Sequence, residues 1–420
     1  MHLTGSQGAA VPSRYGWVVV AVSATVSLLA WSVRSTFAAF YVALLEEFAW
    51  RRGEAAVGYS LSWLLLLVFS PVAGWLYDRW GARVLVPAGG LLLGVALALT
   101  GQVTTLWQYY LAFGVLAAAG IAGIQIPAAV IVSRWFVHSR GTAMGVISAG
   151  ASASAIVFYP VNTYLIVAFG WRTALAMFGL LVAAVTIPLA ACLYRDPPGR
   201  IEGSPPGRSD PTPSGEEWTL ARALRSVPFW GVFAMWGFGV VGYQIMTTHQ
   251  VAHALERGFS AVTLGWLFAA GGACTVAGNV LGGALSDRWG REWVFALGSA
   301  IGISGIACFG RLAGPEDMLL LLGYVAAGVG FGMRIALLAT IPADLFAGRH
   351  LGVILGAAQG GGGLGGFIGP PLGGWLFDVT GGYGTAFTVA ALAIAASAVA
   401  AWVAAPRRAR AARRALGGTG

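Results

Sequence analysis

One short motif occurs twice in the chain, as GWLYDRWGAR in residues 74–83 and as GALSDRWGRE in residues 283–292. The two copies place Asp78 and Asp287 at a separation of 209 residues (287 − 78), which is about half of the 420-residue chain. Such a repeat predicts two structurally equivalent halves. Outside the two copies, most of the sequence consists of long apolar runs, and these runs determine the class of fold.

The composition excludes a water-soluble globule. Hydrophobic residues make up 57% of the chain, charged residues make up 10%, and the mean hydropathy is +0.75. Soluble domains carry about 25% charged residues, so the chain is predicted to be an integral membrane protein. The 25 arginines and 16 acidic residues give a net charge of +9. The positions of the arginines, given below, argue against nucleic-acid binding as the reason for this charge.

The apolar runs predict an all-α integral membrane protein with 12 transmembrane helices in two pseudo-symmetric six-helix bundles. A crossing needs about 20 apolar residues, and these continuous runs differ from the alternating strands of an outer-membrane barrel. The predicted spans are residues 16–45, 55–77, 84–104, 106–133, 141–168, 173–194, 227–255, 261–285, 293–312, 318–345, 351–377 and 385–405.

The arginines predict the orientation, because short cytoplasmic loops are enriched in them. With the N-terminus inside, eighteen arginines lie on the cytoplasmic side and five outside. We therefore expect a multi-pass protein of the cytoplasmic (inner) membrane with both termini cytoplasmic. The remaining two, Arg34 and Arg334, lie within spans.

The polar stretches divide the chain into domains. A segment rich in Pro, Gly and Ser separates spans six and seven and predicts a flexible cytoplasmic linker. The arginine-rich C-terminal tail predicts binding to anionic lipid head groups. The predicted units are an N-terminal segment (1–14), a six-helix bundle (15–195), the linker (196–225), a second bundle (226–405) and the tail (406–420).

Nothing in the sequence predicts an enzyme. Cys192, Cys274 and Cys308 lie in apolar segments without metal-ligand spacing, so they are interpreted as packing residues. The chain has no lysine and hence no Walker-type phosphate loop. We expect no metal and no cofactor, and we expect a monomer.

The duplicated G-x-x-x-D-R-x-G-x-R motif resembles the signature of the major facilitator superfamily. Further stretches resemble its monocarboxylate transporter branch, including bacterial members and the related oxalate:formate antiporters. The resemblance implies alternating access by two rocking bundles, with spans one, four, seven and ten lining a central cavity. The stretches are YGWVVVAV (15–22), RSTFAAFYVALLEEF (34–48), RWFVHSRGTAMGVISAGASAS (134–154) and GPPLGGWLFDVTGGYGTAF (369–387).

The motif residues are predicted to form a cytoplasmic gate that is closed in one state and open in the other. Glycines allow close helix packing, and the aspartates can cap a helix or pair with arginine. The alternative is that they serve only topology and turns. The predicted gate residues are Gly74, Asp78, Arg79, Gly81, Arg83, Gly283, Asp287, Arg288, Gly290, Arg291, Arg134 and Arg140.

Arg34 and Arg334 are the candidates for substrate binding. An arginine in the membrane costs about 2.5–3.5 kcal/mol on insertion scales and normally faces a cavity, where its guanidinium can hold a carboxylate at two points. The alternatives are snorkelling for Arg34 and a tie between helices for Arg334. Here the chain also departs from the family, whose span eight carries an Asp and an Arg where this sequence has Thr275 and Asn279. We expect Arg334 to replace the missing Arg, and Thr275 and Asn279 to donate hydrogen bonds to the substrate. Further candidates are Gln125, Tyr324 and Gln359.

Proton coupling is the least determined feature. None of the carboxylates falls in the middle of a predicted span, whereas His249 and His253 lie four residues apart on one face of span seven. We expect these histidines to carry the proton. The alternative is that they are polar residues near the membrane interface.

These observations predict a secondary active transporter for a small organic anion, a monocarboxylate, coupled to protons. Two intramembrane arginines without a carboxylate favour an anionic ligand. The alternatives are a proton-independent anion exchanger of the oxalate:formate type and an exporter of amphipathic compounds. The predicted partners are a small carboxylate, protons and the lipid bilayer.

Overall fold

The structure, a computed structural model, describes residues 14–48, 50, 52–136, 139–195, 197, 218–314 and 317–404. The predicted basic tail, almost all of the N-terminal segment and most of the linker therefore lie outside the described residues. The described part of the linker contains one short helix, α9 (Leu220–Leu224), which Thr219 caps. Trp218 packs edge-on against Phe346 at the end of the following bundle, so this stretch is packed against the fold.

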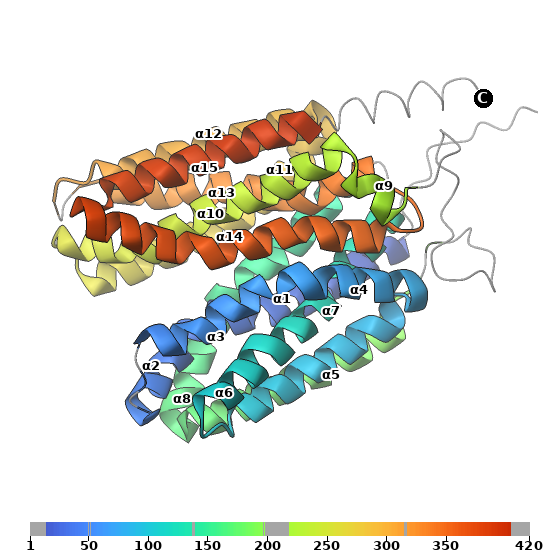
Figure 1. The fold of residues 1–420 in the computed structure, drawn as a ribbon, viewed down its shortest axis with the longest axis horizontal. Helices are drawn as coiled ribbons and strands as arrows, with labels where there is room; N and C mark the ends of the chain where they lie inside the picture. The colour runs from blue at the N-terminus through green and yellow to red at the C-terminus, as the bar shows by residue number, and fades with distance from the viewer. Residues whose placement is uncertain are drawn as a thin grey trace, which may run out of the picture.

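The helices form two bundles that lie one above the other in Figure 1. The upper bundle in that view contains the second half of the chain and the lower bundle contains the first. The first-half helices are α1 (Arg14–Ser35), α2 (Phe37–Phe48), α3 (Arg52–Leu64), α4 (Leu66–Trp80), α5 (Ala82–Thr100), α6 (Leu106–Tyr109), the π-helix η1 (Tyr110–Leu116), α7 (Ala117–Trp135) and α8 (Arg140–Leu193).

The second half has one continuous helix for each predicted span. Its helices are α10 (Val227–Glu256), α11 (Ala261–Trp289), α12 (Arg291–Gly310), α13 (Leu319–Leu345), α14 (Leu351–Thr380) and α15 (Tyr383–Ala404).

Eleven helical segments of the described residues are long and apolar enough to cross a membrane. One of them, α8, contains 54 residues, which is about 80 Å of helix and more than one crossing can use. Its backbone leaves the helical region at Gly170, where φ is 76°. A positive φ favours glycine, and the break divides α8 into the predicted spans five and six. The prediction of a 12-helix fold is confirmed.

Three spans of the first half are less regular than predicted. Span one is interrupted at Thr36 between α1 and α2, and span two at Leu65 between α3 and α4. Span four contains the π-helical turn Tyr110–Leu116. Helices nevertheless approach closely, because glycines face one another: a Cβ at Gly89 would overlap the backbone of Gly123.

A charged cluster ties the loops of the first bundle at the end opposite to the duplicated motifs. Arg172 donates to the carboxylate of Glu47 (2.6 Å) and to the carbonyl oxygens of Gly101 (2.9 Å) and Val103 (3.1 Å). The hydrogen bonds from Arg172 and then from Trp171 lower the pKa of Glu47. Because all these residues belong to one half, the cluster stabilises that bundle and makes no contact between the two.

Candidate functional site

A cavity of about 390 Å³ lies between the two bundles. Helices α1, α7, α10 and α13, the predicted spans one, four, seven and ten, all contribute to its wall. Residues of α3, α4, α8, α11 and α14 complete the lining. The volume lies in the range of ligand pockets, roughly 300–1,000 Å³. Among the described residues that line it there is no Asp, Glu or His.

Arg34 reaches the cavity from the first bundle. Its side chain is 5% exposed, and Nη2 donates to the carbonyl oxygen of Ser62 at 2.9 Å. The guanidinium lies over the ring of Trp63, 4.0 Å from its centroid, as a cation–π contact. Nε and Nη1 are buried without a hydrogen-bond partner in the described structure. Unpaired buried donors are costly, so this group is prepared to receive an acceptor, and it does not snorkel to the interface.

Arg334 reaches the same cavity from the second bundle. It is 3% exposed, Nη2 donates to the hydroxyl of Ser397 at 2.9 Å, and the guanidinium lies 4.9 Å from the Phe295 ring centroid. Nε is buried and unpaired. No carboxylate lies within ion-pair distance of either arginine in the described part of the chain. The cavity is therefore lined by two uncompensated cations, one from each half.

Four of the other predicted binding residues also line the cavity, namely Gln125, Thr275, Tyr324 and Gln359. Nε2 of Gln125 and the hydroxyl of Tyr324 are buried without a hydrogen-bond partner in the described structure, so each keeps an unused hydrogen-bonding group. The hydroxyl of Thr275 donates to the carbonyl oxygen of Gly271, so its hydrogen is already used.

The structure does not bring Asn279 into the cavity. Its amide nitrogen donates to the hydroxyl of Ser152 (2.9 Å) and to the carbonyl oxygen of Thr275 (3.0 Å), and the side chain is completely buried. Asn279 therefore joins α11 to α8 across the two halves. The physical reason is close packing: a Cβ at Gly145 of α8 would overlap the backbone of Asn279.

The two histidines also lie outside the cavity lining. Nε2 of His249 contacts the carbonyl oxygen of Pro370 at 3.2 Å, and Nε2 of His253 contacts that of Phe309 at 3.0 Å. The ring of Tyr383 lies 5.5 Å from both imidazole rings. The predicted face of span seven therefore points between helices of its own bundle, and the proton-carrying role of these histidines stays a prediction that the geometry does not favour.

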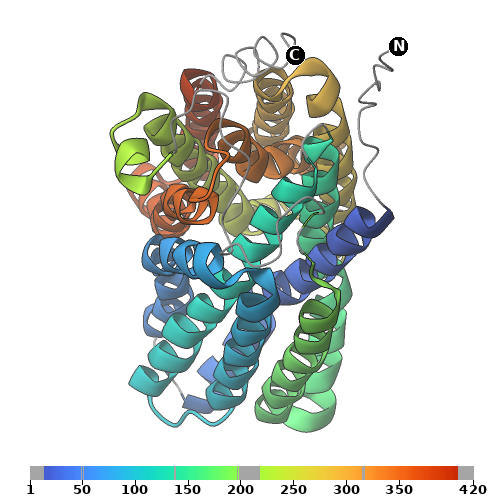
Figure 2. The same cartoon turned by 90° about the vertical axis from the view of Figure 1, so that its right-hand side faces the viewer.

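The two motif aspartates cap helices of the opposite bundle. The carboxylate of Asp78 accepts hydrogen bonds from the backbone N–H groups of Gly352 (3.2 Å) and Val353 (3.0 Å), in the first turn of α14. A helix begins with unpaired N–H groups and a positive dipole end, so a carboxylate there is favourable. We call this contact the Asp78 cap. Figure 2, which looks onto the end of the molecule where α9 lies, shows α4 against α14.

The Asp287 cap repeats this geometry with the halves exchanged. The carboxylate of Asp287 accepts from the backbone N–H groups of Gly141 (3.0 Å) and Thr142 (2.8 Å), in the first turn of α8. The acceptors are 209 residues apart (287 − 78) and the donors 211 apart (352 − 141 and 353 − 142), so the two caps occupy nearly equivalent positions in the two halves. Each cap joins one half to the other.

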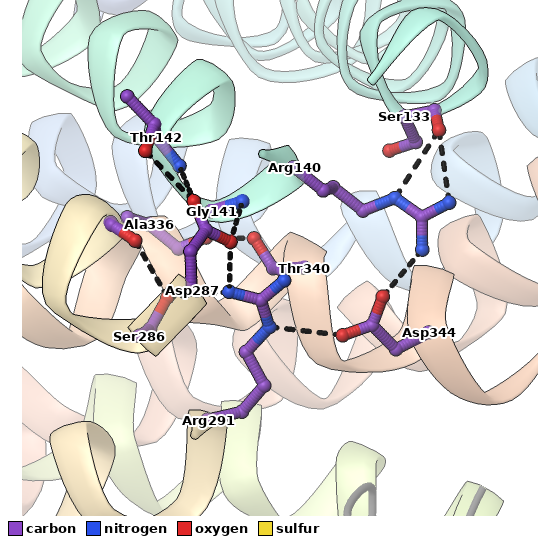
Figure 3. Close-up of polar contacts among 11 residues, drawn as sticks. Ser133, Arg140, Gly141, Thr142, Ser286, Asp287, Arg291, Ala336, Thr340 and Asp344 are labelled. Atoms are coloured by element: carbon purple, nitrogen blue, oxygen red, sulfur yellow. Dashed lines mark hydrogen bonds and ion pairs between the residues drawn. The ribbon is translucent and has the colours of Figure 1, made fainter. Parts of the chain in front are cut away.

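An ion-pair network surrounds the Asp287 cap (Figure 3). Arg291 donates to Asp287 at 2.6 Å and to Asp344 at 2.9 Å, and Arg140 of the first half donates to Asp344 at 2.5 Å. Arg140 also donates to the carbonyl oxygen of Ser133. Asp344 is 4% exposed, so it joins two arginines of different halves in a buried position.

The remaining predicted gate residues separate into three groups. Gly74 and Gly283 are close-approach positions, since a Cβ on either would overlap the carbonyl oxygen of Gly352 or Gly141. Arg134 lies 3.5 Å from Asp78. The third group consists of turn and surface residues. Gly81 and Gly290 lie in turns, with φ of 74° and 102°. The side chains of Arg79, Arg288 and Arg83 are exposed, and Arg83 donates a hydrogen bond to the carbonyl oxygen of Ala191 within its own half.

Asp344 was not predicted as a site residue. The sequence shows it only as a carboxylate near the end of a span, and its two arginine partners come from distant parts of the chain. The one sequence feature that could have indicated a role for Asp344 is its position at the end predicted to be cytoplasmic, where most of the arginines lie. The aromatic side chains of the cavity were missed for a similar reason, because aromatic residues are frequent throughout the chain and most of them resemble an interfacial belt.

A central cavity between two six-helix bundles, sealed at one end by contacts between the halves, defines a membrane transporter and not an enzyme. A family model described as the Major Facilitator Superfamily matches residues 20–262 and 250–420. The protein named monocarboxylate transporter 11 of Mus musculus is 30% identical over 395 residues, which cover 89% of this chain and 84% of the relative. This chain therefore belongs to the major facilitator superfamily, in the branch of the monocarboxylate transporters.

A second relative agrees with this assignment, and two solved structures agree with the fold. Monocarboxylate transporter 13 of Bos taurus is 28% identical over 383 residues, covering 90% of this chain and 86% of the relative. Among solved structures, the human organic anion transporter MFSD10 has a TM-score of 0.73 at 15% identity and covers 92% of this chain and 99% of its own. The E. coli fucose:proton symporter has a TM-score of 0.71 at 16% identity, with coverages of 93% and 100%. These structures support the fold alone.

Proposed function

We propose that this protein is a secondary active transporter that moves an organic anion, a carboxylate, across the cytoplasmic membrane by alternating access. The observation that carries the proposal is the pair Arg34 and Arg334, which line one cavity from opposite halves without a carboxylate among the described lining residues. A buried cation needs a partner, and an anionic substrate supplies it. The names of the related monocarboxylate transporters agree with such a substrate.

The caps supply the conformational part of the proposal. All the described cap contacts lie at the end predicted to be cytoplasmic, which supports a state closed on that side. In the opposite state both caps are open and the cavity faces the cytoplasm. The predicted orientation, with both termini cytoplasmic, belongs to this proposal and is supported by the distribution of arginines.

Two kinds of coupling can drive the transport of the anion, namely proton symport and exchange against a second anion. The cavity lining supports anion exchange over proton symport. With no Asp, Glu or His among the described lining residues, no cavity side chain releases a proton near neutral pH. An empty carrier would have to close around two uncompensated cations, which is unfavourable. A bound anion removes that penalty, so the return step would be faster with a second anion in place.

Reconstitution into proteoliposomes tests the proposal. Arg334→Gln and Arg34→Gln are each expected to weaken anion uptake by about 10- to 150-fold, because each removes a charged hydrogen-bond donor. Arg311→Gln is the matched control, since Arg311 is exposed after α12 and does not line the cavity. Normal uptake by both cavity variants, at equal protein insertion, would overturn the anion site. Acceleration by internal anion indicates exchange, and acceleration by an imposed pH gradient indicates symport.

A further inference from the structure

The apolar wall of the cavity carries an aromatic pair beside each arginine. In the first half, Trp31 and Trp63 line the cavity with ring centroids 5.9 Å apart, and Arg34 lies over both rings. In the second half, Tyr243 and Phe331 line it with parallel rings, 3.5 Å between centroids and 4° between planes. Phe331 precedes Arg334 by three residues and therefore lies on the same side of α13.

The first aromatic pair is held in place by the opposite bundle. A Cβ at Gly366 of α14 would overlap the ring of Trp63, and a Cβ at Gly363 would approach its backbone oxygen. Gly366 of the second half thus lies against this indole, and Gly363 lies against the backbone of the same residue. The indole of Trp63 is therefore packed against the second half while it lines the cavity.

The two aromatic pairs are more than a carboxylate needs. An ion such as acetate would pair with an arginine and leave the rings in contact with water. An apolar group on the substrate would bury ring surface, at roughly 25 cal/mol per Å², and a planar one would also gain offset-stacked or edge-to-face contacts. Further polar contacts could come from the unpaired groups of Gln125 and Tyr324.

We infer that the substrate is a monocarboxylate attached to a planar, apolar body of the size of an aromatic ring. This inference rests on the proposed function and narrows its substrate class. The carboxylate pairs with the free donors of Arg34 and Arg334, and the ring lies between the Trp31–Trp63 pair and the Tyr243–Phe331 pair. A dicarboxylate would place its second charge against the aromatic wall.

A panel of anions tests the inference in proteoliposomes at alkaline pH, where the acids are ionised. Labelled phenylacetate, cyclohexylacetate, acetate and succinate are each exchanged against the same anion inside, with protein-free liposomes as the blank. Phenylacetate is expected to have the lowest half-saturating concentration, about 3- to 10-fold below that of cyclohexylacetate, which is apolar but not planar. Equal or better exchange of acetate or succinate would overturn the inference and leave the proposed function standing. Exchange of none of the four would overturn both.

A substitution in the second aromatic pair gives an independent readout. Phe331→Leu keeps an apolar side chain and removes the ring, so the preference for phenylacetate over acetate should fall by about 3- to 10-fold. Phe238→Leu is the matched control, because Phe238 lies on α10, is 47% exposed and does not line the cavity. An unchanged preference in Phe331→Leu would contradict the inference. If that variant does not insert, Tyr243→Leu makes the same test on the partner ring.

Discussion

The two caps are built on the same backbone geometry but differ in charge. In both caps, a motif aspartate of one half accepts hydrogen bonds from two backbone N–H groups. These N–H groups belong to the first turn of a helix in the other half. Around Asp287 there is a buried network with Arg291, Asp344 and Arg140. Asp78 has one cation within ion-pair distance among the described residues, Arg134 at 3.5 Å.

One position of the repeat explains part of this difference. Aligning the two motif copies pairs Arg291 with Ala82. Backbone capping needs only an aspartate and a helix start, and both halves have kept it. The ion pairs need particular side chains, and one half lacks them. The duplicated fold thus preserves the contact between the halves, while its strength is set separately on each side.

The largest expected effect is that of Asp344→Asn, which removes the carboxylate shared by Arg140 and Arg291. Breaking a buried ion pair costs about 3–5 kcal/mol, and here the loss falls on the closed state of the Asp287 cap. A cysteine at the cavity position Ala155, in a variant without native cysteines, should therefore react far more slowly with an impermeant maleimide added outside. Asp378→Asn, at an exposed site on α14, is the control. Unchanged labelling would show that the network does not hold this end closed.

The second prediction concerns what the two caps share. Gly74→Ala and Gly283→Ala each place a methyl group against a backbone carbonyl of the other half. Overpacking costs about 1–3 kcal/mol and destabilises the state in which the caps are closed. Both variants should therefore lower the rate of labelling of the cysteine at position 155 by similar factors. Gly265→Ala on α11 has open space around its Cβ and serves as the control. A large effect at one glycine only would break the equivalence of the two caps.

The third prediction isolates the difference in charge. Asp78→Asn weakens a helix-dipole contact worth about 0.3–1 kcal/mol and a long ion pair, 3.5 Å, with Arg134. Asp287→Asn also weakens a charged hydrogen bond to Arg291, worth about 1.5–3 kcal/mol. The rate of cysteine labelling should fall more in Asp287→Asn than in Asp78→Asn. When both variants also carry Arg291→Ala, the difference between their labelling rates should become smaller. Equal rates in the two aspartate variants would mean that the ion pairs add nothing to the cap.

The sequence predicted which residues line the cavity better than it predicted which groups those side chains contact. Arg34, Arg334, Gln125 and Tyr324 were singled out because polar groups inside spans are rare, and all four line the cavity. The two histidines carried the same signal, and Asn279 was named because it stands where the family carries an Arg, but all three side chains face other helices. A span position gives depth in the membrane, whereas the direction in which a side chain points depends on how the helix is packed.

The sequence by itself determined the class of this protein, because the length and number of apolar runs admit membrane-spanning helices and the repeated motif predicts two equivalent bundles. The tertiary structure decided the partners. It gave each motif aspartate a helix start in the other half, placed Asp344 between two arginines, and set an aromatic pair beside each cavity arginine. These contacts join residues up to 275 positions apart, so they depend on how the two bundles meet, which no local pattern encodes.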